Sequence, residues 1–210
     1  MDGVIYDSMG NHAKAWCEAF KFFGIDFPAE MAYLNEGRTA ASTINLIFQR
    51  DSIRAATSEE ISMIYTKKTE IFEQLPPSQK MDGIDDLLNT ILEKGMEIWV
   101  VTGSAQERLL DGLVAEFGRF ITRNRIISGL DVKHGKPHPE PYLIALKKSN
   151  LRADEAVVIE NAPLGVESAK GAGIFTIVIN SGILPDSILC DSGGDWIVHR
   201  HSQIQAIFQS

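Results

Sequence analysis

One segment of this sequence has the residue types of a phosphate-binding loop. In the run EIWVVTGS at residues 97–104, an apolar stretch rich in β-branched residues ends at Thr102, as expected of a buried parallel strand that delivers a hydroxyl to a loop. Gly103 lets the backbone approach a ligand closely, and the start of a following helix offers free amide groups to an anion. We therefore interpret Thr102, Gly103 and Ser104 as a phosphate cradle, although TGS is also an ordinary end for a strand.

Three further segments carry charged residues that could work with this cradle. The amino end, MDGVIYDS, contains Asp2; HGKPHPEPY contains Lys136 before a proline; and the apolar run AVVIEN ends in Glu160 and Asn161. Taken singly, these have ordinary interpretations as an acidic turn, a surface loop and a solvated acid at a strand end. Their order along the chain is what favours one common site.

In this order the four segments resemble the motifs of the haloacid dehalogenase superfamily of phosphatases and phosphomutases. The resemblance implies that Asp2 acts as general acid and base and ligates Mg²⁺ through its backbone carbonyl. Thr102 and Lys136 then stabilise the charge on the phosphoryl oxygens. Glu160 and Asn161 match the place where the family holds its metal, usually with an acid followed by Asp. Asn161 can still offer a carbonyl oxygen to Mg²⁺, but one negative charge is lost.

The family's nucleophile, an aspartate that follows a buried strand, falls directly ahead of Met1 in this comparison. We expect the natural protein to begin about ten residues earlier with that strand, because losing it forgoes on the order of 10 kcal/mol of apolar burial, against a total stability of about 5–15 kcal/mol. We also expect the chain as given to be unable to form the phosphoenzyme.

The spacing of apolar residues divides the chain into two parts. Residues 11–79 show helical spacing without a strand pattern, and the prolines of LPPSQK near residues 75–80 end the helices. From Met81 onward, helices alternate with predicted strands near residues 97–101, 126–128, 156–159, 175–179 and 196–198. This alternation predicts an α/β fold with a Rossmann-like, doubly wound parallel sheet. The expected core is residues 1–10 and 80–210, and residues 11–79 match the family's inserted helical cap domain.

Within the predicted cap, three residues resemble substrate-binding positions of β-phosphoglucomutases. Arg38, in the Gly-containing turn NEGRTAAST, offers a planar fork of donors to a distal phosphate or sugar hydroxyl. His12 matches a hinge residue that supports the acid/base Asp, and Lys67 matches a substrate-facing Lys in a looser alignment. A surface position is the alternative for each. Trp16 is interpreted as part of the core of the cap.

Composition limits the class of protein. The chain has 210 residues, of which 44% are hydrophobic, and a formal net charge of −8, which argues against a nucleic-acid partner. No apolar run is long enough to span a membrane. Cys17 and Cys190 lack metal-site spacing and are interpreted as free thiols of a reducing compartment. We therefore expect a cytoplasmic monomer.

The predicted function is Mg²⁺-dependent phosphoryl transfer on a small phosphorylated sugar, as in a β-phosphoglucomutase-like phosphomutase that works through an aspartyl phosphate. A sugar-phosphate phosphatase is the first alternative, and an inactive relative that binds a phosphorylated metabolite is the second. A metal-independent dehalogenase is disfavoured by Asp2 and Glu160.

Overall fold

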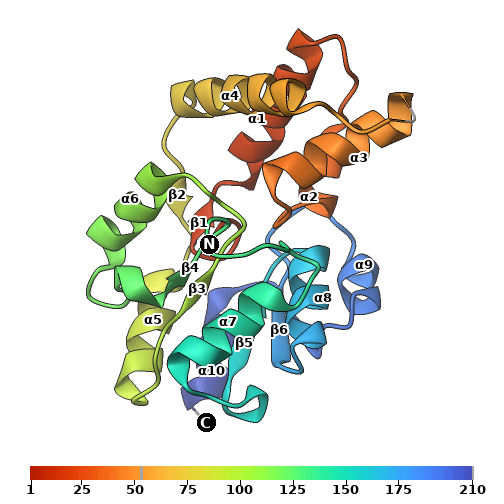
Figure 1. The fold of residues 1–210 in the computed structure, drawn as a ribbon. Helices are drawn as coiled ribbons and strands as arrows, with labels where there is room; N and C mark the ends of the chain where they lie inside the picture. The colour runs from red at the N-terminus through yellow and green to blue at the C-terminus, as the bar shows by residue number, and fades with distance from the viewer. Residues whose placement is uncertain (53, 210) are drawn as a thin grey trace.

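The computed structural model describes residues 1–52 and 54–209, and its helices and strands are arranged as two stacked parts (Figure 1). The upper part consists of α1 (Met9–Phe22), α2 (Ala29–Leu34), α3 (Ala40–Ser52) and α4 (Ser58–Gln74). Their apolar faces pack together around buried residues that include Phe20, Ile44, Ile47 and Ile64. Thr57 and Glu60 form a capping box that fixes the start of α4.

The lower part is an α/β unit, as the alternating pattern predicts. Its parallel strands are β3 (Val100–Val101), β4 (Ile126–Ile127), β5 (Val157–Glu160), β6 (Phe175–Ile179) and β7 (Trp196–Val198). The helices between them are α5 (Ile84–Glu93), α6 (Glu107–Phe117), α7 (Glu140–Ser149), α8 (Pro163–Gly171), α9 (Asp186–Asp191) and α10 (His201–Gln209), with 3₁₀ turns at Arg123–Arg125 and Ala153–Glu155. One apolar cluster packs α5, α6 and α10 together and a second joins α7 and α8, so helices cover both faces.

The sheet is divided into two pieces, which differs from the single sheet that the sequence predicts. β3 pairs with β4, and β5, β6 and β7 form the other piece in that order. Within the described residues, the second edges of β3 and β5 have no strand partner. An apolar groove of about 550 Å³ runs between them, with Met1, Val100, Ile159 and Leu146 among its lining residues. The groove is wide because no strand lies between β3 and β5.

The chain crosses between the two parts through a short antiparallel pair, β1 (Tyr6–Asp7) with β2 (Gln79–Lys80). The sequence pattern did not predict this pair. The loop before β1 is tied to the C-terminal half of the chain, because Ser181 Oγ donates to the Gly3 carbonyl at 2.5 Å and His201 Nε2 lies 2.7 Å from the Val4 carbonyl oxygen. The amino end therefore lies at the centre of the molecule, where the two parts meet (Figure 1).

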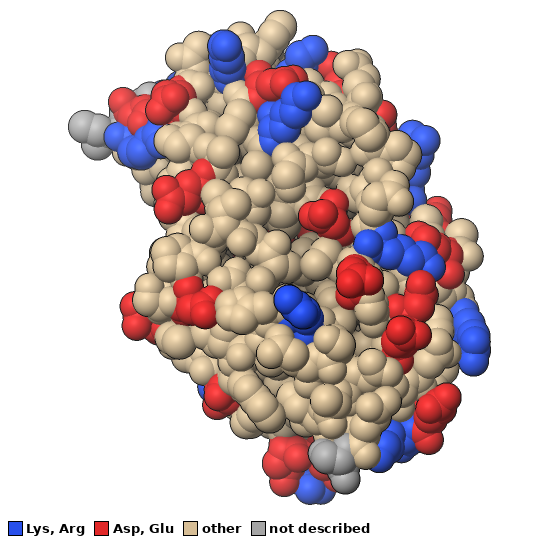
Figure 2. Space-filling model, turned by 180° about the vertical axis from the view of Figure 1, so that it is seen from behind, with Lys and Arg blue, Asp and Glu red and all other residues tan. Residues whose placement is uncertain are grey.

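The surface agrees with the composition. On the face shown in Figure 2, acidic and basic side chains are interspersed, and the described residues form no continuous basic stripe across it. Among the described residues, no helix combines the length and the apolar character needed to cross a membrane.

Candidate active site

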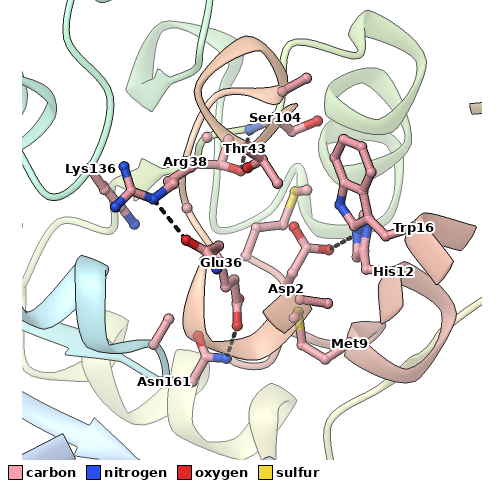
Figure 3. A pocket seen from close by; sticks show the side chains of 18 of the residues that line it. Asp2, Met9, His12, Trp16, Glu36, Arg38, Thr43, Ser104, Lys136 and Asn161 are labelled. Carbon is pink, nitrogen blue, oxygen red and sulfur yellow. Dashed lines mark hydrogen bonds and ion pairs between the residues drawn. The ribbon is translucent and has the colours of Figure 1, made fainter. Parts of the chain in front are cut away.

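A cavity of about 110 Å³ lies between the upper helices and the carboxyl ends of β3 and β5 (Figure 3). Parallel strands bring their carboxyl ends to one edge of a sheet, which is where such folds bind ligands. The structure places nearly all of the predicted site residues on the wall of this cavity: Asp2, His12, Arg38, Thr102, Gly103, Ser104, Lys136, Glu160 and Asn161.

Asp2 is held by two donors at the base of the upper helices. Ser8 Oγ donates to Asp2 Oδ1 at 2.6 Å, and His12 Nε2 lies 3.1 Å from the same oxygen. Burial by itself disfavours the ionised carboxyl, but the charge and hydrogen bond of His12, together with Ser8, hold the pKa of Asp2 well below its usual range. His12 in turn stacks on Phe72, with ring centroids 4.4 Å apart. Asp2 is therefore an ionised carboxylate of fixed orientation, in the form that can accept a proton.

Lys68, and not the predicted Lys67, is the lysine of α4 that lines the cavity. Lys68 Nζ lies 3.0 Å from His12 Nδ1, and burial lowers its pKa to about 8, partly opposed by the charge of Asp2. Lys67 points away and forms an ion pair with Glu70 at 3.2 Å. Successive helical residues differ in direction by about 100°, and Lys68 lies four residues from both Ile64 and Phe72 on the inward face. That spacing was the signal that could have identified Lys68.

Lys136 and Glu160 form a buried ion pair beneath the cavity. Lys136 Nζ also donates to the Val101 carbonyl at 3.2 Å, and the Tyr142 hydroxyl donates to the same Glu160 oxygen as the lysine. Burial by itself raises the pKa of Glu160, but the positive charge and hydrogen bond of Lys136 bring it below its ordinary value. Sequence reasoning missed Tyr142, because no motif accompanies a tyrosine in the first turn of a helix.

The loop after β3 has the shape of the predicted cradle. The backbone amide of Thr102 donates to the Ile127 carbonyl at 2.9 Å, which fixes the end of β3. Thr102 Oγ1 accepts from the amide of Ser104 at 3.1 Å, and Ser104 Oγ accepts from the amide of Gln106 at 3.3 Å. Thr102, Gly103, Ser104 and Gln106 line the cavity wall, before α6 begins.

Two further polar residues come from the turn between α2 and α3. The Arg38 Nε donates to Asn35 Oδ1 at 2.9 Å, so the guanidinium is braced within its own turn. Glu36 accepts a hydrogen bond from Asn161 Nδ2 at 2.8 Å. Burial, with the nearby carboxylates of Asp2 and Glu160, raises the pKa of Glu36 well above its ordinary value. The sequence singled out this turn for Arg38, but gave no reason to select Glu36.

The oxygen donors near Asn161 are of the kind that Mg²⁺ accepts. They are the carboxylates of Glu36 and Glu160, the amide oxygen of Asn161 and the backbone carbonyl of Asp2. In the part of the chain that the structure describes, no three acidic, histidine or cysteine side chains are grouped closely enough to hold a metal alone. Glu160 is already engaged by Lys136. The set fits Mg²⁺ by ligand type.

Comparisons with known proteins agree with this arrangement. The family of haloacid dehalogenase-like hydrolases matches residues 1–179. Relatives include the fructose-1-phosphate phosphatase of Escherichia coli, 27% identical, with 84% of this chain and 92% of that protein covered. The beta-phosphoglucomutase of Bacillus subtilis is 23% identical, with 87% of this chain and 81% of that protein covered.

A solved structure from Bacteroides vulgatus, provisionally described as a beta-phosphoglucomutase, is 44% identical with a TM-score of 0.95. The match covers 100% of this chain and 85% of that one. The family match spans most of the chain, and the cavity brings together Asp2, Thr102, Lys136 and Glu160 from the four segments that carry the sequence resemblance. On this evidence the chain belongs to the haloacid dehalogenase-like hydrolases.

Proposed function

We propose that the protein transfers the phosphoryl group of a small phosphorylated sugar in a Mg²⁺-dependent reaction, with a phosphomutase outcome. The observation that carries the proposal is the single cavity in which Asp2, Thr102, Lys136 and Glu160 meet, although they come from four distant segments. A carboxylate that can move a proton, a hydroxyl and amide cradle, and a buried cation are the groups that phosphoryl transfer needs.

The roles follow from the contacts of each side chain. Asp2 takes the proton from the attacking hydroxyl and returns it to the leaving oxygen, while Ser8 and His12 hold it in place. Lys136 and the loop at Thr102 stabilise the negative charge on the phosphoryl oxygens. The upper helices close the site and exclude water, which corresponds to a cap formed by residues 11–79 over a core of residues 1–10 and 80–210.

Mg²⁺ would be held by Glu160, the Asn161 amide oxygen and the Asp2 backbone carbonyl, with Glu36 close by. When bound, the ion would supply positive charge that stabilises the phosphoryl oxygens. We propose that a further carboxylate of this set belongs to an aspartate joined directly ahead of Met1, which is also the nucleophile.

The apolar groove between β3 and β5 supports this position for the nucleophile. Met1 lines both the groove and the cavity, so an apolar strand seated in the groove would lead directly into the site. The free edges of β3 and β5 offer backbone partners on both sides of such a strand.

The phosphomutase outcome is favoured by cationic residues on both walls of the cavity. Lys136 lies on the strand side, and Arg38 and Lys68 lie on the side of the upper helices. This arrangement suits a sugar that carries phosphate at two ends during turnover. A phosphatase is the second candidate, favoured by the names of relatives such as the fructose-1-phosphate phosphatase.

We further propose a cytoplasmic enzyme that acts as a monomer. The described residues that line the cavity all belong to one chain, which supports a monomer. The free thiols of Cys17 and Cys190 suit a reducing compartment.

The test is an N-terminal extension that carries a short apolar strand followed by Asp directly ahead of Met1, compared with the same extension ending in Asn. Both proteins are assayed against a panel of sugar phosphates, with and without Mg²⁺ and a bisphosphate primer. The proposal predicts Mg²⁺-dependent turnover by the Asp form alone. Formation of an isomeric sugar phosphate identifies a mutase, whereas release of inorganic phosphate identifies a phosphatase. Equal turnover by the Asn form contradicts the proposed nucleophile.

A further inference from the structure

The turn between α2 and α3 and the end of β5 are joined across the cavity by one hydrogen bond, from Asn161 Nδ2 to Glu36 Oε2 (Figure 3). The two residues are 125 positions apart in sequence. Glu36 belongs to the upper helices and Asn161 to the strand side, so the bond can form only when these two parts are close together.

The same turn fits tightly onto the strand side at neighbouring points. A Cβ atom built on Gly37 would lie 2.8 Å from the Lys136 side chain, and one built on Gly103 would lie 2.5 Å from the Gly37 carbonyl oxygen. Within the turn, Asn35 donates to the Met31 carbonyl at 2.9 Å and receives the Arg38 hydrogen bond. The turn is therefore a braced unit that docks as a whole, with Glu36 at its tip.

The side chain of Asn161 is also fixed on its own side. A Cβ atom on Gly3 would lie 2.0 Å from Asn161 Nδ2, so the amide packs directly on the backbone that follows Asp2. An amide at position 161 supplies the N–H that a carboxylate at position 36 needs as partner. An aspartate there would place another acceptor among Asp2, Glu36 and Glu160 with no N–H to offer.

We propose that Glu36 and Asn161 form a latch that holds the upper helices closed over the strand ends, and that Glu36 is the reason for an amide at position 161. Glu36 is a positioning residue in this account. The latch replaces an acid at position 161 by a carboxyl group carried on the moving part, so that this carboxyl group reaches the wall of the cavity only on closure. This inference does not depend on the reaction proposed above.

The test measures closure in the chain as it exists. Spin labels are attached at Cys190, which is exposed on α9, and at a cysteine that replaces Met63, which is 50% exposed on α4. Cys17→Ser removes the other thiol. The distance distribution between the two labels reports how closely the upper helices approach the strand side, and it requires no substrate or turnover.

Asn161→Asp is expected to lower the closed population about tenfold, since the hydrogen bond from the Asn161 amide to the Glu36 carboxyl group is lost. Glu36→Gln combined with Asn161→Asp reverses donor and acceptor and is expected to restore the closed distribution. Asn89→Asp is the matched control, because its amide donates to the Asp85 carbonyl within α5 and it does not line the cavity. Thermal unfolding of every variant checks that the fold is kept.

Two outcomes overturn the latch. One is a wild-type distance distribution in Asn161→Asp, and the other is a failure of the reversed pair to restore closure in a protein that unfolds at the normal temperature. A measurement of inorganic phosphate binding adds a second readout: weaker binding in Asn161→Asp, recovered in the reversed pair, is expected. Absence of catalysis in any of these proteins bears on the proposed function and leaves the latch unaffected.

Discussion

Replacing Lys136 by Met isolates the energetic role of the buried ion pair beneath the cavity. The side chains of Lys136 and Glu160 are only 6% and 7% exposed, so solvent screens their attraction very little. Without the lysine, the Glu160 carboxylate keeps the Tyr142 hydroxyl and one backbone amide as donors but loses its ion-pair partner. Breaking a buried pair by removing one partner costs about 3–5 kcal/mol. For a chain of this length the melting temperature then falls by roughly 6–20 °C.

The dependence of this loss on pH tests its cause. In the wild type the pKa of Glu160 is below its ordinary value, so the carboxylate adds stability above the unfolded pKa and loses it as the pH falls through the folded value. In Lys136→Met, burial still raises the pKa of Glu160, and only the charge of the amino terminus and the Tyr142 hydrogen bond oppose it. The folded pKa of Glu160 therefore rises, and the penalty grows as the pH rises above about 4.3. The stability gap between wild type and variant should therefore narrow steadily from pH 7 toward pH 4.5, measured by urea unfolding with chelator present.

A double variant supplies the control for this prediction. Lys136→Met combined with Glu160→Gln removes both charges and should recover at least about 1 kcal/mol relative to Lys136→Met alone. A loss below 1 kcal/mol for Lys136→Met, or a gap that does not change with pH, would refute the reasoning.

Three further predictions concern stability. The first concerns Lys68, whose pKa is lowered to about 8 in the folded protein, so that between pH 8 and 10.5 the unfolded chain keeps a proton that the folded protein releases. The free energy of unfolding of the wild type should therefore rise by at most about 3 kcal/mol over this pH range. Urea titrations measure this rise, and Lys68→Met should abolish it. Gly103→Ala places a Cβ 2.5 Å from a backbone oxygen and should lower the free energy of unfolding by about 1–3 kcal/mol. Gly112→Ala, in open space on α6, should raise it by about 0.5–1 kcal/mol. Equal denaturation midpoints for the two variants would contradict the close contact at Gly103. Tyr142→Phe removes a donor to Glu160 and should cost about 1–3 kcal/mol, as measured by thermal unfolding; an unchanged melting temperature would argue against that hydrogen bond.

Strong local patterns made much of this fold predictable from sequence. The β-branched run ending at Thr102 and the apolar run ending at Glu160 identify strands whose carboxyl ends must share one edge of an α/β unit. That rule is sufficient to expect Thr102 and Glu160 in one cavity, where the structure places them. Helical spacing likewise identified the upper helices.

Features that depend on tertiary contacts were not predictable. β1 and β2 are two residues each, too short to show a period, and they form because the two crossings between the parts run side by side. Glu36 lines the cavity and is bonded to Asn161, and Tyr142 donates to Glu160 from α7; no local sequence pattern records either contact. Lys67, which the sequence resemblance indicated, is not among the cavity-lining residues, whereas the neighbouring Lys68 is, because a step of one residue along a helix turns the side chain by about 100°.

The most direct test of the account is whether this cavity carries out phosphoryl transfer on a carboxylate. The protein with the N-terminal extension whose last residue, directly ahead of Met1, is Asp is incubated with a sugar phosphate. The reaction is quenched in acid and the protein is examined by intact mass spectrometry and peptide mapping. The account predicts the added mass of one phosphoryl group on that aspartate, absent from the matched Asn form and reduced when Lys136 is replaced. The same phosphoryl mass in the Asn form, or a phosphoryl group on a residue outside the cavity, would contradict the central claim.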